Sequence, residues 1–200
     1  RFWALDPAWR ASMRRAGAGF LETAGITAIL VTHDQAEALS FADQVAVMRE
    51  GRFSQVGTPR ELYLKPKDRM VAEFLGEALV LPARVAGGFA DTPLGRIALD
   101  TAARHDVARV MLRPEQVRLD RASRAEAAAA QPGLLYGEVT ETESAGASGA
   151  VAVKLINTPD PPAAAAIGAT PLMLRRPGVE APAVGDIVLI RVVGPAHMLA

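Results

Sequence analysis

Residues 28–38 read AILVTHDQAEA, and this stretch decides the fold class of the first part of the chain. It continues an apolar run over 26–31 without alternation, which is typical of a parallel strand covered by helices on both faces. A helix is predicted to begin directly afterwards, because Asp34 is a good N-cap and Glu37 stands at the capping-box position. His33 is therefore expected at the carboxyl end of a buried strand, the edge at which open α/β sheets collect their ligands.

Short helices and a hairpin are predicted on either side of this stretch. Upstream, an amphipathic helix is expected after Pro7, because Trp9, Met13, Ala16 and Phe20 recur at helical spacing. Downstream, two apolar runs separated by a turn with glycine predict a hairpin over 45–57. A helix opened by Thr58, Pro59 and Glu61 follows, and a second is expected from about 68 to 75, ending at Gly76.

From about residue 77 the pattern changes to short apolar or alternating runs punctuated by Gly and Pro. The expected strands are 80–85, 96–99, 108–112, 137–142, 151–155, 172–174 and 187–193. Many short strands joined by turns predict a small β-barrel or sandwich. Two alanine-rich stretches, 125–130 and 163–166, are interpreted as loops or a short helical insertion.

Composition excludes several classes of function. The chain has 200 residues, enough for one or two domains, and 22 Lys and Arg balance 22 Asp and Glu, so no basic field attracts nucleic acid. No apolar run approaches the roughly 20 residues that a membrane span needs. The chain has no cysteine, which excludes disulfides and thiolate metal sites and fits a reducing cytoplasm. The first residue is Arg1 rather than Met, which suggests a processed or truncated chain.

The stretch at 28–38 resembles the switch-histidine loop of ABC-transporter ATPases, whose histidine reaches the terminal phosphate of ATP. Residues 43–52, DQVAVMREGR, follow it at the distance at which this family places a hairpin. Residues 1–7, RFWALDP, look like the end of the Walker B–D-loop run of the same family. The resemblance implies that His33 contacts the γ-phosphate and orients the attacking water. It also implies that Asp6 lies at the dimer interface beside the partner's ATP.

Each of these two residues also has a plain structural interpretation. Taken alone, His33 is most simply interpreted as a surface or capping histidine. The residues that surround it in the sequence instead favour the role in contacting ATP. Asp6 before Pro7 is a common helix start, a role compatible with the D-loop. Trp3 and Arg1 depart from the family pattern, which has a small residue and Pro there. By the family's spacing, the catalytic glutamate and the metal-binding aspartate lie before Arg1.

The second half resembles the TOBE accessory domain of importer ATPases. The resemblance rests on 111–117 (MLRPEQV), 137–139 (GEV) and 184–189 (VGDIVL). Arg113 is either an anion ligand, since guanidinium suits oxyanions, or part of a strand-ending turn with an internal Arg–Glu contact, and the second interpretation is preferred.

Together these features predict an α/β segment, the carboxyl-terminal piece of a P-loop NTPase ABC domain, over 1–76, followed by an all-β, TOBE-like small barrel over 77–200. The resemblance implies an ATP-hydrolysing subunit of a bacterial importer that uses ATP and Mg²⁺ in the intact protein. It implies a homodimer, transmembrane permease subunits, an indirect link to a periplasmic binding protein, and a place on the cytoplasmic face of the inner membrane. The chain by itself is expected to be inactive, since it lacks the Walker A, signature and Walker B motifs.

The cargo and the alternative functions rest on weaker signals. Residues 74–78 (FLGEA) and 91–95 (DTPLG) look most like ATPases of ferric-iron importers, although polyamine, sulfate and sugar importers share the architecture. The alternative is a regulatory module whose β-barrel binds a small oxyanion or braces a dimer. No metal site is expected, because His105 and His197 have no third ligand at a suitable spacing.

Overall fold

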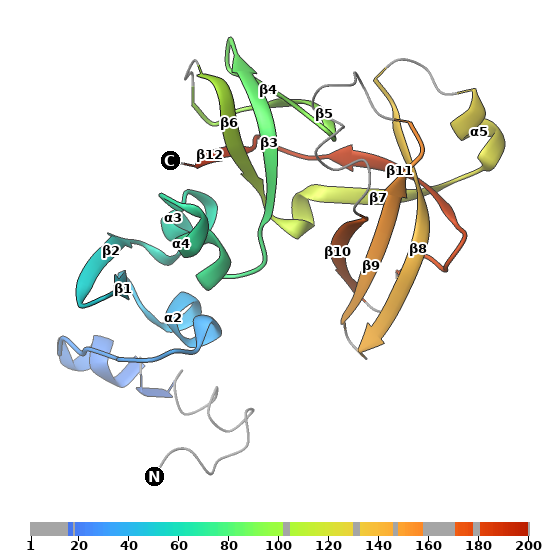
Figure 1. The fold of residues 1–200 in the computed structure, drawn as a ribbon. Helices are drawn as coiled ribbons and strands as arrows, with labels where there is room; N and C mark the ends of the chain where they lie inside the picture. Colours follow the sequence, from blue (N-terminus) through green and yellow to red (C-terminus); the bar gives the residue numbers. More distant parts are fainter. Residues whose placement is uncertain are drawn as a thin grey trace.

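The computed structural model describes residues 16–17, 19–101, 105–129, 133–145, 148–157, 171–177 and 181–199. Asp6 and most of the helix expected after Pro7 lie outside these residues. Within them the chain is mixed α/β, and most of its elements are strands (Figure 1). The expectation of an α/β fold with a β-rich second half is confirmed at this level.

The first part of the chain contains short helices and one hairpin. Residues 19–24 are helical, and the helix ends at Gly25, whose φ of 64° lets the Ile26 N–H reach the Leu21 carbonyl at 3.0 Å. The elements that follow are α2 (Gln35–Phe41), β1 (Val45–Arg49), β2 (Arg52–Gly57), α3 (Pro59–Leu64) and α4 (Arg69–Phe74).

Local sequence signals explain these elements. The β1–β2 turn uses Glu50 and Gly51 with φ of 52° and 74°, the left-handed pair that a tight hairpin turn requires. Helix α3 opens with a complete capping box, in which the Thr58 hydroxyl accepts from the Glu61 N–H at 3.2 Å and the Glu61 carboxylate accepts from the Thr58 N–H at 2.9 Å. The predicted hairpin, both helices and their caps are confirmed.

The strand predicted over 26–31 is wrong for this structure. These residues have no regular secondary structure, and Ile29 and Val31 are 91% and 92% exposed. A parallel strand receives all its hydrogen bonds from neighbouring strands. The described residues contain no strand beside 26–31, so the apolar run remains unpaired and His33 does not follow a buried strand.

The second part consists of two five-stranded sheets, ordered β12-β6-β3-β4-β5 and β10-β9-β8-β11-β7, whose strand ladders are all antiparallel. The strands of the first sheet are β3 (Leu79–Ala86), β4 (Phe89–Thr92), β5 (Gly95–Ala98), β6 (His105–Leu112) and β12 (His197–Leu199). Those of the second are β7 (Val117–Ala122), β8 (Leu135–Ala145), β9 (Ser148–Leu155), β10 (Leu172–Pro177) and β11 (Ile187–Val192).

The two sheets share one apolar core. Leu81 and Val110 of the first sheet and Val151 and Val188 of the second are fully buried members of the same cluster. The chain passes between the sheets through the 3₁₀ turn Pro114–Gln116 and through the segment that joins β11 to β12 (Figure 1). Apolar residues alternate along the strands because one face of each sheet meets this core.

Three strands were not anticipated from the sequence: β4, β7 and β12. Each is short or carries charged side chains that hide the alternation, such as Arg118 and Asp120 on the face of β7 opposite Val117 and Leu119. The alanine-rich stretch at 125–130 overlaps a short helix, α5 (Arg124–Ala128), opened by a capping box from Ser123 to Glu126. The stretch at 163–166 lies outside the described residues.

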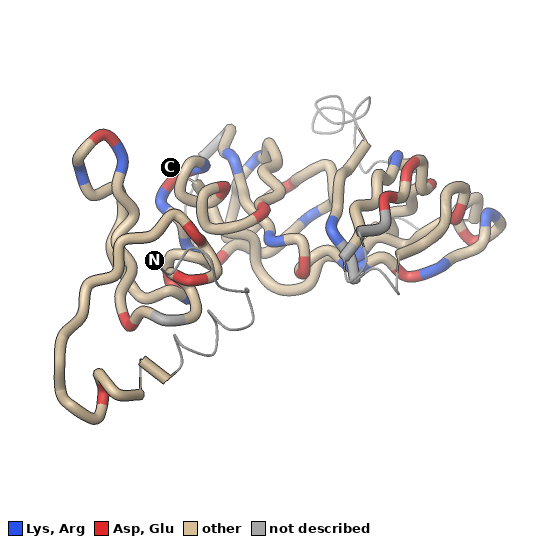
Figure 2. The backbone as a smooth tube through the Cα atoms, turned by 90° about the horizontal axis from the view of Figure 1, so that it is seen from below, with Lys and Arg blue, Asp and Glu red and all other residues tan. Residues whose placement is uncertain are grey.

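A second, smaller apolar cluster holds the first part of the chain together. It consists of Val45, Val47, Leu62, Val71 and Leu75, with Ala38, Leu39, Ala42 and Met70 packed against it. Helices α3 and α4 therefore pack on α2 and β1 through this cluster. Positive and negative side chains are interspersed along the described tube (Figure 2), in keeping with the balanced charge of the sequence.

Candidate functional site

His33 lies in an exposed loop immediately before α2. Two hydrogen bonds brace this loop: Thr32 donates to the Glu37 carboxylate at 2.7 Å, and the Thr32 hydroxyl accepts from the Asp34 N–H at 3.0 Å. Asp34 caps α2, as predicted, by accepting from the Glu37 N–H at 3.1 Å. The loop thus presents an accessible imidazole next to a short helix with a defined start.

Asp6, the other expected site residue, lies outside the described residues. Among the residues described, no cluster of three or more His, Cys, Asp or Glu side chains has an arrangement that would hold a metal ion. Of the two site residues expected from the sequence, His33 is the one that lies among the described residues.

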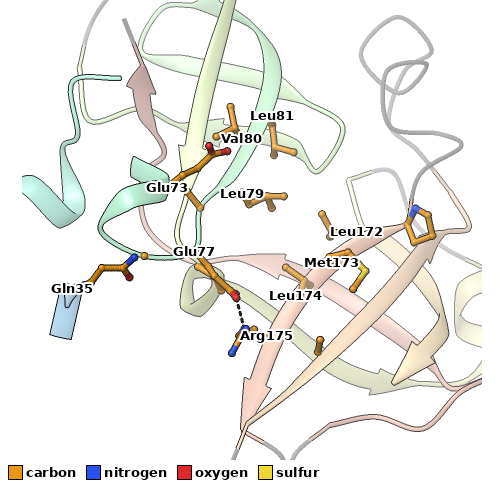
Figure 3. A pocket seen from close by; sticks show the side chains of 15 residues that line it. Gln35, Glu73, Glu77, Leu79, Val80, Leu81, Leu172, Met173, Leu174 and Arg175 are labelled. Atoms are coloured by element: carbon orange, nitrogen blue, oxygen red, sulfur yellow. Dashed lines mark ion pairs between the residues drawn. The ribbon is translucent and has the colours of Figure 1, made fainter. Parts of the chain in front are cut away.

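A pocket of ≈ 770 Å³ lies where the two parts of the chain meet (Figure 3). Gln35, two residues after His33, lines it from α2, and Glu73, Leu79 and Leu172 line it from α4, β3 and β10. An ion pair between Arg175 and Glu77 spans from β10 to the segment before β3. The pocket is therefore walled by both parts of the chain.

The structure confirms that Arg113 lies in a strand-ending turn, because β6 ends at Leu112 and the 3₁₀ turn Pro114–Gln116 follows. Its side chain is fully buried, and its guanidinium donates to the main-chain carbonyls of Tyr63, Ala72, Gly76 and Glu77. The donor–acceptor distances run from 2.7 Å for Nη2 to Tyr63 to 3.1 Å for Nη1 to Gly76. Arg113 is therefore not an available anion ligand, and its guanidinium donates to main-chain carbonyls instead of the expected glutamate.

Glu115, the acid expected to pair with Arg113, instead accepts from the Tyr63 hydroxyl at 3.0 Å. The Arg113 guanidinium lies over the Tyr63 ring, 4.0 Å from its centroid. Burial raises the pKa of the Tyr63 phenol, and the nearby Glu115 carboxylate raises it further. Burial lowers the pKa of Arg113, although a guanidinium remains charged throughout the ordinary pH range.

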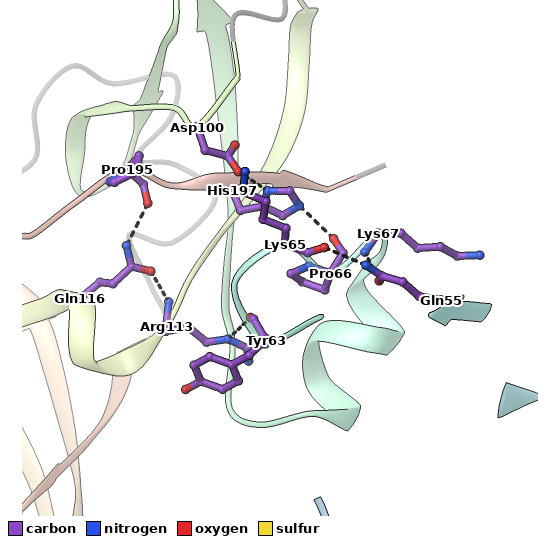
Figure 4. A network of polar contacts seen from close by, with 10 residues as sticks. All are labelled: Gln55, Tyr63, Lys65, Pro66, Lys67, Asp100, Arg113, Gln116, Pro195 and His197. Atoms are coloured by element: carbon purple, nitrogen blue, oxygen red, sulfur yellow. Dashed lines mark hydrogen bonds and ion pairs between the residues drawn. The ribbon is translucent and has the colours of Figure 1, made fainter. Parts of the chain in front are cut away.

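His197 also joins the two parts of the chain (Figure 4). Its Nε2 lies 2.9 Å from the Pro66 carbonyl between α3 and α4, and its Nδ1 lies 2.6 Å from Asp100. Because a carbonyl only accepts, Nε2 carries a proton. His197 is thus a bridge from β12 to the α3–α4 connection, a role that its place near the end of the sequence did not reveal.

The sequence carried a partial signal for Arg113 and none for His197. Arg113 directly follows the apolar residues Met111 and Leu112, which suggests that it is drawn toward the core, and a buried arginine must find several acceptors. The carbonyls that it binds lie 36 to 50 residues earlier in the chain, so no local pattern identifies them.

Comparison with known proteins identifies close relatives over the whole chain. The chain is 66% identical over 197 residues to the Fe(3+) ions import ATP-binding protein FbpC of Mesorhizobium japonicum, a match that covers 98% of this chain and 54% of that protein. It is 41% identical over 199 residues to the protein of the same name from Pseudomonas fluorescens, covering 100% of this chain and 53% of the relative.

A third relative of that name, from Serratia marcescens, is 59% identical over 118 residues, which are 59% of this chain and 34% of the relative. No family model matches the chain. The chain spans about half the length of the first two relatives.

Proposed function

We propose, on the premise that the homologues of this chain are Fe(3+) ions import ATP-binding proteins, that it is part of the ATP-hydrolysing subunit of a ferric-iron importer. The observation that carries this proposal is the 66% identity to one such protein over nearly the whole chain. The exposed, braced loop at His33 supports it, since that loop bears the residue expected to act on ATP.

In this proposal His33 donates a hydrogen bond to a γ-phosphate oxygen and orients the attacking water. Phosphoryl transfer depends mainly on positioning and on stabilising charge that develops on the phosphate oxygens, which an imidazole N–H supplies without covalent chemistry. The Thr32–Glu37 and Asp34–Thr32 hydrogen bonds limit the freedom of the loop on both sides of His33. Asp6 is proposed to lie beside the nucleotide of a second subunit in a homodimer.

The unpaired apolar run at 26–31 fits this proposal. Exposed Ile29 and Val31 need cover, and a sheet supplied by a longer protein would bury them and place His33 at a sheet edge. We propose this run as a strand of a P-loop ATPase sheet in the full-length subunit. The relatives, about twice as long as this chain, have room for such a sheet.

The remaining parts of the proposal concern organisation. The segment 77–200 acts as a TOBE-like accessory domain, and 1–76 belongs to the ATPase domain. ATP and Mg²⁺ serve the intact subunit, which works at the cytoplasmic face of the membrane with permease subunits and, through them, a periplasmic binding protein. No helix in the described part of the chain is long and apolar enough to span a membrane.

The 200-residue chain itself is proposed to be inactive. Nowhere does it contain the G-x-x-x-x-G-K-[ST] sequence whose backbone amides cradle the phosphates of ATP. Purified chain should therefore release no phosphate from ATP above background, whereas the full-length subunit with its permease should.

The test is a His33→Ala substitution in the full-length subunit, with Gln44→Ala at an exposed position nearby as the matched control. Loss of one preorganised donor should lower kcat for ATP hydrolysis by about 10²- to 10³-fold while leaving ATP binding nearly unchanged. The control should retain the wild-type rate. Normal turnover by the His33 variant would contradict the catalytic assignment.

The iron assignment has a separate test. Deletion of the gene should abolish uptake of ferric iron, and the intact gene, but not one carrying His33→Ala, should restore it. Unchanged ferric-iron uptake in the deletion strain would contradict the cargo and leave the ATPase assignment standing.

A further inference from the structure

Helices α3 and α4 are held from two opposite sides. On one side, Leu62, Val71 and Leu75 insert into the apolar cluster that also contains residues of β1 and carries Leu39 of α2 against it. These three leucine and valine side chains are at most 1% exposed. The helices therefore cannot shift relative to α2 without opening that cluster.

On the other side, the Arg113 guanidinium donates hydrogen bonds to main-chain carbonyls of the same helical turns. Of the carbonyls that it binds, Tyr63 directly follows Leu62, Ala72 follows Val71, and Gly76 follows Leu75. Each of the three residues that α3, α4 and its C-cap bury in the apolar cluster thus has a neighbour whose carbonyl is bound by Arg113. The guanidinium is a planar fork that satisfies these acceptors together, so the three turns are fixed as one unit relative to the sheets.

The connection between α3 and α4 repeats this arrangement with different residues (Figure 4). From the hairpin side, the Gln55 amide donates to the Lys65 carbonyl at 3.0 Å and accepts from the Lys67 N–H at 2.8 Å. From the sheet side, His197 binds the intervening Pro66 carbonyl. A second, independent set of contacts therefore ties the first part of the chain to the β-sheets through the same two helices.

We propose that Arg113 is a positioning residue that makes α3 and α4 a rigid link between the two-sheet unit and α2, the helix that begins next to His33. A displacement of the two-sheet unit is then passed to the His33 loop instead of being absorbed at the junction. The part of this inference that concerns ATP hydrolysis rests on the proposed function of His33. The mechanical part concerns contacts within this chain and stands separately.

The mechanical part is tested by hydrogen exchange on the 200-residue chain carrying Arg113→Lys or Arg113→Met. Lysine keeps the positive charge but lacks the planar guanidinium that reaches several acceptors at once. Arg113→Lys should therefore accelerate exchange less than Arg113→Met does. Peptides covering 35–49, which Arg113 does not touch, should exchange about 10-fold faster in the methionine variant. Peptides from β8 and β9 serve as the internal reference for global unfolding.

Two controls make the result specific. Arg191→Met removes an exposed ion pair with Asp120 within the sheets and should leave exchange at 35–49 unchanged. Faster exchange confined to 63–77 in the Arg113 variants would overturn the proposal, since Arg113 would then act only on the carbonyls that it binds. Because Arg113→Met also lowers the global stability of the chain, the comparison between peptides is decided in the milder variant, Arg113→Lys. Acceleration at 35–49 that is no greater than in β8 and β9 of Arg113→Lys would overturn the proposal as well.

The functional part uses the full-length subunit with the same substitutions. Because Arg113 does not touch the nucleotide in this proposal, Arg113→Lys should lower kcat about 10-fold with KM for ATP within about twofold, and Arg113→Met should lower kcat further. Wild-type kcat in both variants would overturn the link to His33. If the wild-type subunit itself hydrolyses no ATP, the proposed function fails, and the exchange experiment still decides whether the rigid link exists.

Discussion

Replacing Arg113 with methionine should cost this chain more stability than any exposed substitution. The side chain is fully buried and its guanidinium serves four carbonyls, with the Tyr63 ring stacked against one face. Methionine fills part of the volume but donates nothing, so the carbonyls of Ala72, Gly76 and Glu77 lose their contact with Nη1. Leaving a buried acceptor without a donor costs about 1–3 kcal/mol for each group, so the loss of these contacts should total about 3–5 kcal/mol once water reaches some of the carbonyls.

That magnitude can be checked from the individual contacts. A hydrogen bond to a charged group contributes about 1.5–3 kcal/mol when its partner stays buried, and water that enters the vacated site offsets part of the loss. Arg191→Met, which breaks an ion pair between half-exposed side chains, should cost about 0.2–1 kcal/mol. The expected difference between the two variants is therefore about 2–5 kcal/mol.

Urea denaturation monitored by far-ultraviolet circular dichroism measures this difference in the free energy of unfolding. The midpoint should shift strongly for Arg113→Met and slightly for Arg191→Met, with similar m-values, because the surface exposed on unfolding is nearly the same. A loss below about 1 kcal/mol for Arg113→Met would refute the view that these carbonyls depend on the guanidinium.

Two further predictions concern packing and pH. In Gly137→Ala the new methyl carbon would approach the Val153 Cγ1 atom far inside contact distance, so the Val153 side chain or its strand must shift. Thermal unfolding should show a loss of about 1–3 kcal/mol, and an unchanged Tm would contradict this close approach. The Glu61 pKa is lowered by hydrogen bonds from Thr58, so its contribution to stability is present above the carboxyl's unfolded pKa and is lost as pH falls through the folded one. The difference in Tm between the wild-type chain and Glu61→Gln should accordingly become smaller as the pH is lowered from 7 to 3. A difference in Tm that does not change with pH would argue against the capping box.

Local elements could be predicted because their determinants lie within a few residues of one another. The capping box joins Thr58 to Glu61, three residues apart, and the hairpin turn depends on the adjacent Glu50 and Gly51. The Asp34 cap of α2 has the same short range. Such interactions form whatever the rest of the chain does, so their sequence patterns specify them directly.

The candidate site could be predicted in part. The sequence singled out His33 and its loop by resemblance, and the structure describes that loop as exposed and braced. It did not predict that 26–31 remains unpaired here, because strand formation depends on neighbours that the run itself does not encode. Asp6 stays a prediction.

Only the tertiary structure decided which distant groups meet. Arg113 binds carbonyls up to 50 residues away, and His197 binds Pro66 across 131 residues. Every residue has a main-chain carbonyl, so the sequence does not show which carbonyls will accept a hydrogen bond from a buried arginine or histidine. The sequence by itself determined the caps, the turn and the His33 loop through short-range hydrogen bonds. The folding of two sheets around one core determined the link between that loop and the rest of the chain, because only packing brings those carbonyls within reach of Arg113 and His197.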